Sequence, residues 1–246
     1  IYYFVLNHLR HKFKIIAVIS TFGLYQTSLS FQEFLSNKIN TLVPDFNGIA
    51  SIPIVLIAIL LFELDDYLKH VIAHKYLWFL HEFHHSATEM TILNRDRNSI
   101  LESFIEKLIT FPIFVISITI IGKLLIQGKY FAFGIFITYE IARELTSFIG
   151  HSSTKMIFPR PFSYIFMSPS LHWLHHSSNP RHFNKNFGLV LTIWDKVFGT
   201  YLDVTHLDEI KSFGFKNSQY NKSHPLYSYF VLPYIKFNKR YKIFPF

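Results

Sequence analysis

Nine histidines at repeated spacings are the residues of this chain best suited to chemistry. The segment DDYLKHVIAHKYLWFLHEFHHS, residues 65–86, contains five of them. If this segment is helical, His70 and His74 lie one turn apart, and His81 and His85 lie one turn apart again. Imidazole rings one turn apart can share a metal ion, so the segment predicts a metal site.

The adjacent pair His84 and His85 indicates more than one ion. Their side chains diverge by about 100° around a helix, so they cannot easily serve the same metal. The HxxHH pattern returns downstream as LHWLHHS, and GHSS adds a histidine between the two copies. These segments supply His151, His172, His175 and His176. A single HxxHH is weak evidence, whereas two copies, each followed by serine, favour a site for two metals.

Residues other than the nine clustered histidines limit the kinds of metal site that are possible. The chain has no cysteine, which excludes zinc-finger and iron–sulfur sites built on thiolates. His182 is either a tenth ligand or a surface residue, and we favour the surface. Asp65, Asp66 and Glu82 could accept the second ring N–H of a ligating histidine, or could lie on a solvated helix face.

The composition is that of a membrane protein. Half of the 246 residues are hydrophobic, which is unusual for a soluble domain of this length. The formal net charge is +8, but the basic residues lie beside apolar stretches rather than on one polar helix. Anionic lipid headgroups therefore explain the charge more simply than nucleic acid, and we expect no nucleic-acid partner.

Four apolar runs indicate membrane crossings, at residues 13–31, 49–62, 108–126 and 130–149. The last two are separated by a turn-like Gln-Gly-Lys and predict a helical hairpin. We expect an all-α integral membrane protein with about four transmembrane helices, in a single domain over residues 1–246. The histidine-rich segments would form a helical cap, and the residues from 211 onward an irregular or amphipathic tail on the membrane surface.

The distribution of lysine and arginine predicts the orientation. The loops at Lys38 and at Lys123 with Lys129 carry few positive charges, whereas the side that holds the histidines carries many. By the positive-inside rule, all clustered histidines are cytoplasmic, in a bacterial inner membrane or the endoplasmic reticulum. Four crossings would bring both HxxHH segments to the same side.

Five blocks of the sequence resemble the fatty acid hydroxylase/sterol desaturase superfamily, membrane enzymes with a histidine-rich di-iron centre. The blocks are DDYLKHVIAH, WFLHEFHHSATEM, GHSS, HWLHHSSNPRHFNKNFG and WDKVFGTYL, and the resemblance covers about residues 63–202. It implies that the ligands are the nine clustered histidines, His70, His74, His81, His84, His85, His151, His172, His175 and His176. Two features depart from the family. The interval from His74 to His81 is about two residues shorter than usual, and Asn98 in RNSILE stands where many members have His, followed by Pro and Glu.

The resemblance implies a di-iron oxygenase. Such an enzyme uses O2 and electrons from a cytoplasmic donor to hydroxylate or desaturate a C–H bond of a fatty acyl chain, sterol or related lipid. Ligand type alone does not name the metal, because imidazole suits zinc, copper, iron and nickel. Nine imidazoles nevertheless exceed the needs of one tetrahedral zinc ion. No His-Pro-Gly-Gly segment marks a fused cytochrome b5-like domain, so we expect a separate electron-transfer protein.

Two other functions remain open from the residues. A metal transporter could carry histidine-rich cytoplasmic segments, but it should line its pathway with ionisable residues, which the runs at 49–62 and 108–126 scarcely offer. A zinc-dependent membrane hydrolase would need a general base and fewer histidines. The metal content of the purified protein separates these alternatives from the oxygenase.

Overall fold

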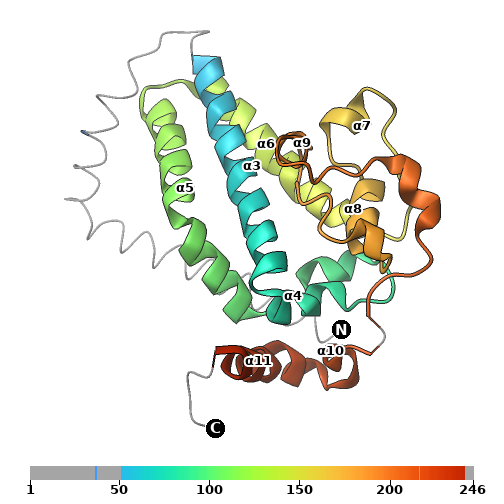
Figure 1. Cartoon of the computed structure of the whole chain (residues 1–246). Helices are drawn as coiled ribbons and strands as arrows, with labels where there is room; N and C mark the ends of the chain where they lie inside the picture. The colour runs from blue at the N-terminus through green and yellow to red at the C-terminus, as the bar shows by residue number, and fades with distance from the viewer. Residues whose placement is uncertain (1–36, 38–50, 216, 242–246) are drawn as a thin grey trace.

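Three long helices form the frame of the molecule. The computed structural model describes residues 37, 51–215 and 217–241. The helices are α3 (Ser51–Lys75), α5 (Ile100–Ile126) and α6 (Tyr130–Gly150), and α3 packs between the other two (Figure 1). Within the described ranges the elements are all helical, with two isolated bridges as the only strand-like pairings. The predicted all-α class is therefore confirmed for this part of the chain.

The frame is held together by an apolar core at the end remote from the histidines. Side chains from α3, α5 and α6 pack there, and their burial removes apolar area from water. The core residues are Val55, Ala58, Ile59, Phe62, Ile121, Leu124, Ala132, Phe136, Tyr139 and Val190. The predicted hairpin of α5 and α6 is present. Its turn contains Gly128 at φ 69°, a left-handed conformation that glycine adopts without steric cost.

Shorter helices lie beside α6 and below the C-terminal end of α3, where they form a cap (Figure 1). They are α4 (Trp78–His85), η2 (Ile92–Asp96), α7 (Phe162–Ile165), α8 (Pro169–His176), η3 (Pro180–His182), α9 (Ile193–Val197), η4 (Val204–Glu209), α10 (Gln219–Lys222), η5 (Tyr227–Val231) and α11 (Leu232–Tyr241). The segment from residue 211 onward, predicted to be an irregular or amphipathic tail on the membrane surface, packs in part against the rest of the protein. It is mostly helical, and Tyr220, Tyr229 and Leu232 bury themselves against Phe83 of α4.

One helix in the described part of the chain, over Leu101–Leu124, is long and apolar enough to cross a membrane. The prediction of four crossings is therefore supported for only one helix. The run at 13–31 lies outside the described residues. Of the run at 49–62, residues 51–62 form the first half of α3, which then continues into charged residues. Helix α6 carries Glu140, Arg143 and Glu144 near its end.

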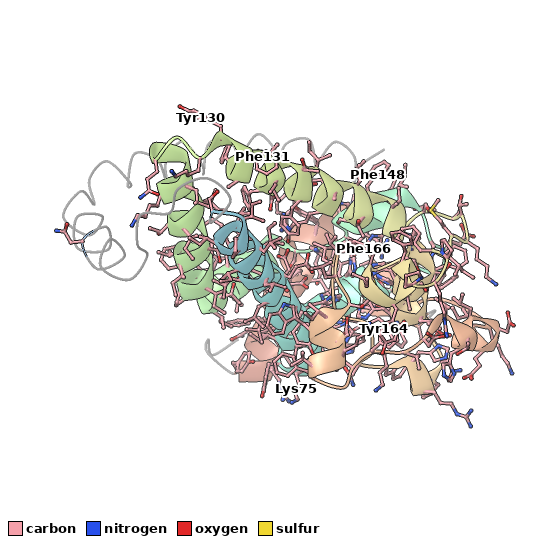
Figure 2. The ribbon with its side chains drawn as sticks, turned by 90° about the horizontal axis from the view of Figure 1, so that it is seen from above. Lys75, Tyr130, Phe131, Phe148, Tyr164 and Phe166 are labelled. Atoms are coloured by element: carbon pink, nitrogen blue, oxygen red, sulfur yellow. The ribbon has the colours of Figure 1, made fainter. Side chains whose placement is uncertain are left out.

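The outer sides of α5 and α6 expose large apolar side chains. Phe104 and Leu108 of α5 are 63% and 65% exposed, and Tyr130 and Phe131 of α6 are 72% and 73% exposed. Figure 2 shows Tyr130, Phe131 and Phe148 along the outer edge of α6. Large apolar side chains exposed together along a helix match a lipid environment.

We predict that both halves of the histidine cap lie on one side of the membrane. In the cysteine-free chain, single cysteines at Thr88→Cys and Ser178→Cys should react with an impermeant thiol reagent from the same side. Lys129→Cys, in the turn between α5 and α6, should react from the opposite side. Labelling of the first two from different sides would contradict the shared cap.

Candidate metal centre

A break in the first histidine segment brings its two HxxxH pairs together. The segment is two helices rather than the single helix assumed from its sequence, because α3 ends at Lys75 and α4 begins at Trp78. The turn folds α4 back beside the end of α3. The ring centroids of His70 and His81 lie 5.3 Å apart, and those of His74 and His85 lie 4.7 Å apart. The short interval between the pairs is therefore compatible with one cluster.

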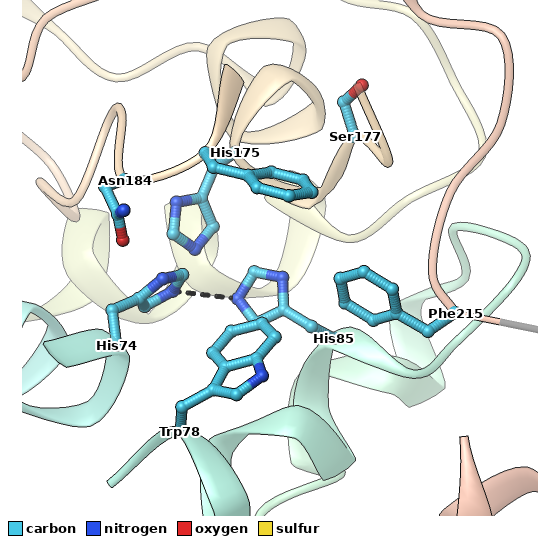
Figure 3. A pocket seen from close by; sticks show the side chains of 8 residues that line it. His74, Trp78, His85, His175, Ser177, Asn184 and Phe215 are labelled. Atoms are coloured by element: carbon cyan, nitrogen blue, oxygen red, sulfur yellow. Dashed lines mark hydrogen bonds between the residues drawn. The ribbon is translucent and has the colours of Figure 1, made fainter. Parts of the chain in front are cut away.

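The first cluster contains five histidines from three helices. They are His70, His74, His81, His85 and His175, from α3, α4 and α8. One ring nitrogen of each lies within 4.8 Å of the others. Figure 3 shows His74, His85 and His175 pointing toward one another, and the Nε2 atoms of His74 and His85 are 3.0 Å apart. We call this set the five-histidine cluster.

The second cluster contains four buried histidines, His84, His151, His172 and His176. Their Nε2 atoms form a chain of close contacts. The distances are 3.2 Å from His84 to His151, 3.1 Å from His151 to His172, and 3.0 Å from His172 to His176. His84 and His85 thus serve different clusters, as their divergence around the helix predicts. We call this set the four-histidine cluster.

Local sequence explains how α8 presents its three histidines. Ser168 caps the helix by accepting a hydrogen bond from the Leu171 amide, and Pro169 occupies the first turn. Both are favourable at a helix start. Because α8 begins at a fixed residue, His172 and His176 lie one turn apart in the four-histidine cluster. His175 lies on a different side of α8 and joins the five-histidine cluster.

In several rings the outer nitrogen, the one that points away from the cluster, makes a hydrogen bond. The Nδ1 atom of His70 donates to the Phe187 carbonyl at 2.9 Å, and that of His175 donates to the Lys185 carbonyl at 2.8 Å. A carbonyl oxygen can only accept, so these rings carry their proton on Nδ1 and direct an Nε2 lone pair into the cluster. His151 makes the same kind of bond to the Ser147 carbonyl, at 3.0 Å.

The ring nitrogens that face the inside of each cluster have the spacing expected around a metal ion. Two imidazoles bound at about 2.1 Å and at a right angle place their nitrogens about 3.0 Å apart, close to the observed contacts. The Nε2 atoms of His81 and His175 are buried without a hydrogen-bond partner. Converging lone pairs repel one another unless a cation lies between them. Each cluster could therefore hold a metal ion, consistent with the prediction of two.

Glu102 was not among the predicted site residues, yet it contacts one of the clustered histidines. Its Oε1 atom lies 2.5 Å from Nδ1 of His81, and the carboxylate is 1% exposed. Such a carboxylate fixes the orientation and tautomer of a ligating ring. The signal in the sequence was the RNSILE stretch. There Asn98 replaces the usual histidine, but the chain keeps a glutamate four residues later, in the first turn of α5.

The acidic residues predicted behind the ligands have other partners, so that expectation is corrected. Asp65 pairs with Lys69 one turn later in α3. Asp66 accepts from Arg143 of α6 at 2.6 Å, and Glu82 pairs with Lys236 of α11 at 2.7 Å. Asp66 and Glu82 thus join different helices, whereas the Asp65 pair lies within α3, and each of the three carboxylates pairs with a cation rather than with a histidine.

His182 belongs to neither cluster. Its side chain is 0% exposed, so the preference for a surface position was wrong. Its Nε2 atom lies 3.4 Å from one oxygen of the Glu209 carboxylate. The Nδ1 atom of His206 lies 2.8 Å from the other oxygen of the same carboxylate. His8 and His11 lie outside the described residues.

Burial keeps the clustered rings neutral. It lowers the pKa of His81 to about 3 and that of His151 to about 4, with the Ser147 carbonyl partly opposing the change at His151. The pKa values of His175 and His176 are also lowered, by burial and then by neighbouring histidines. Neutral imidazole is the form that binds metals, so the clusters keep their lone pairs available at neutral pH.

A cavity of about 280 Å³ opens onto the five-histidine cluster (Figure 3). His74, His85 and His175 form one wall, and Trp78, Phe183 and Phe215 provide apolar surface. Asn184 and Ser177 are its other polar residues, and no charged side chain lines it. None of its lining residues belongs to the four-histidine cluster.

Removing one ring from either cluster should lower metal content. We predict that His85→Ala loses metal from the five-histidine cluster and His176→Ala from the four-histidine cluster, because each change opens a coordination position. Metal analysis of the purified variants measures this. His206→Ala, outside both clusters, is the matched control and should retain the wild-type content. Full metal content in both cluster variants would refute the assignment.

Acid should destabilise the metal-free chain. Unfolded histidine has a pKa near 6.5, whereas His151 in the fold has a pKa of about 4. Between these values the unfolded chain binds protons that the folded chain refuses, so stability falls as the pH drops and is unaffected above 6.5. Each such ring should contribute about 1.4 kcal/mol per pH unit to the free energy of unfolding. Denaturant unfolding across this window tests it, and His151→Phe should show a shallower dependence than wild type.

Comparison with known proteins identifies the family. The sequence model described as fatty acid hydroxylase matches residues 55–200, which include all nine clustered histidines. The chain is 29% identical to alkylglycerol monooxygenase of Caenorhabditis elegans over 144 residues, which are 58% of this chain and 26% of that protein. It is 29% identical to ornithine lipid hydroxylase OlsE of Rhizobium tropici over 152 residues, 60% of this chain and 41% of that protein.

A third relative is named as an aldehyde decarbonylase rather than as a hydroxylase or a monooxygenase. The very-long-chain aldehyde decarbonylase GL1-4 of Oryza sativa subsp. indica is 27% identical over 129 residues, 50% of this chain and 19% of that protein. The chain spans less than half the length of each of these relatives. No solved structure matches it. Because the family model covers more than half of the chain and every clustered histidine, this chain belongs to the fatty acid hydroxylase family.

Proposed function

We propose that this chain is a membrane-bound di-iron oxygenase that uses O2 to hydroxylate or desaturate a C–H bond of a lipid. The observation that carries the proposal is the pair of adjacent, buried, all-histidine clusters. Five and four neutral imidazoles suit two redox ions with room for a further ligand, and exceed what a single zinc ion needs. The relatives named as a monooxygenase and a hydroxylase support the reaction class.

The nine clustered histidines would hold the two iron ions. With two electrons and two protons from an external donor, the bound ions would reduce O2, giving water and either a hydroxylated carbon or a carbon–carbon double bond. Glu102 and the carbonyls of Phe187 and Lys185 would keep the ring nitrogens directed at the ions. These buried hydrogen bonds fix the ligands before substrate binds.

The cavity would hold the reacting part of the lipid. Its volume of about 280 Å³ is at the lower limit for a small-molecule pocket, so it would accept a segment of a lipid rather than the whole molecule. The rings of Trp78, Phe183 and Phe215 would exclude water from that segment. His74, His85 and His175 would then face its carbon atoms.

The exposed apolar sides of α5 and α6 support a membrane location. They would lie in lipid, with the histidine cap on the cytoplasmic side, in a bacterial inner membrane or the endoplasmic reticulum. A separate electron-transfer protein would approach from that side. Membrane attachment also gives the enzyme access to its substrate, because long-chain lipids partition out of water.

The lipids of cells that express the chain test this function. Under oxygen-18 gas, hydroxylation should yield a lipid that carries one heavy oxygen atom, and desaturation should yield one that lacks two hydrogens. His85→Ala should abolish the new species and His206→Ala should not, since only His85 belongs to a cluster. An unchanged lipid profile, or zinc as the only bound metal together with hydrolytic turnover, would overturn the proposal.

A further inference from the structure

The turn at residues 184–188 reaches two ligands of the five-histidine cluster through its backbone. The Lys185 carbonyl accepts from His175 at 2.8 Å, and the Phe187 carbonyl accepts from His70 at 2.9 Å. These histidines come from different helices, α8 and α3. A displacement of this turn would therefore change the orientation of two rings at once.

The turn has an unusual conformation that its own side chains support. Asn184 and Asn186 have φ angles of 59° and 56°, in the left-handed region that asparagine tolerates better than most residues. The Asn186 side chain is buried and donates to the carbonyls of Leu171 and Leu202 at 3.1 and 3.0 Å. It also accepts from the Leu202 amide at 2.8 Å, which joins the turn to the start of α8 and to the segment after α9.

A buried carboxylate holds the other end of the turn. Asp195 is 0% exposed, and it accepts hydrogen bonds from the amides of Phe187 and Gly188, each at 2.8 Å. The Thr200 hydroxyl donates a third at 2.6 Å. A Cβ atom on Gly188 would lie 2.9 Å from the Asp195 carboxylate and 2.4 Å from the Leu191 carbonyl, so the close approach requires glycine.

We propose that Asp195 is a positioning residue for the five-histidine cluster. The Gly188 amide shares a peptide plane with the Phe187 carbonyl, so its bond to Asp195 fixes the carbonyl that sets the tautomer and direction of His70. The Lys185 carbonyl, which does the same for His175, lies two peptide units earlier in the same turn, where the Asn186 amide donates to the Thr200 carbonyl at 2.9 Å. Asp195 supports that second bond through the Thr200 hydroxyl. This assigns a role to the WDKVFGTYL block, which is far from the histidines in sequence and contributes no ligand. The inference rests on the proposed function only in taking the clusters to be metal sites.

The effect should be confined to one cluster. In the four-histidine cluster, His151 donates to the Ser147 carbonyl of α6. That bond lies within α6 and its C-terminal cap, so the turn at 184–188 does not set it. A residue that merely stabilised the fold would weaken both clusters together, whereas Asp195 should affect one.

The test is a titration of the metal-free full chain in detergent with Co²⁺, followed by counting of bound metal. Wild type should bind two equivalents. Asp195→Asn places an NH2 group against the backbone amides and should weaken one of the two equivalents by about 10 to 100-fold, the usual effect of losing a group behind a ligand. Asp203→Asn is the matched control. Asp203 also accepts from a backbone amide, that of Thr205, but it serves the cap of η4 and should leave both affinities unchanged.

The outcomes distinguish a failure of the proposed function from a failure of the positioning role of Asp195. Failure of wild type to bind two equivalents would count against the proposed function. Two equivalents in wild type with no change, or with an equal loss at both sites, in Asp195→Asn would overturn the positioning role. If circular dichroism shows that Asp195→Asn does not fold, Thr200→Val removes only one hydrogen bond of the carboxylate. A selective loss of a few-fold would then support the role, and no selective loss would overturn it.

Discussion

The structure depends on gathering nine neutral imidazoles, seven of them buried, whose inner nitrogens approach one another. Without cations between them, such nitrogens place lone pairs against lone pairs in a site that burial shields from water. The outer nitrogens of four of these rings are satisfied elsewhere, those of His70, His151 and His175 by backbone carbonyls and that of His81 by Glu102. Each of these outer bonds protonates Nδ1 and leaves Nε2 free. The arrangement is thus prepared for metal before any metal binds.

The rest of the frame serves to hold three chain segments against one another. Glu63 in the middle of α3 accepts from the Tyr139 hydroxyl of α6 and from the Leu191 amide, both at 3.0 Å. Asp66, one turn later, pairs with Arg143 of α6. These links join α3, α6 and the segment that follows η3; the Glu63 carboxylate is buried, whereas Asp66 and Arg143 are partly exposed. Removing the partners of Glu63 would leave a buried carboxyl group without its hydrogen bonds, which costs more than the loss of an exposed ion pair.

The sequence predicted which histidines come together better than it predicted what surrounds them. Helical spacing was enough to separate His84 from His85, since their divergence is a property of any helix. The turn between α3 and α4 was not predictable from spacing alone, because either one helix or two would keep the pairs one turn apart. The bonds from His70 and His175 go to backbone carbonyls at least ten residues away, and a carbonyl leaves no signature in a side-chain pattern. The burial of His182 likewise depends on packing between η3 and η4.

The two clusters differ in their access to the cavity. Three rings of the five-histidine cluster form its wall, while the four-histidine cluster is enclosed by protein and contributes none of the lining residues. His84 and His85 are adjacent in α4, so two neighbouring side chains of one helix belong to the enclosed cluster and to the open one. A molecule in the cavity would therefore meet the five-histidine cluster first. The ring directions of His70 and His175 matter most there, since they determine where an ion in this cluster lies relative to the cavity.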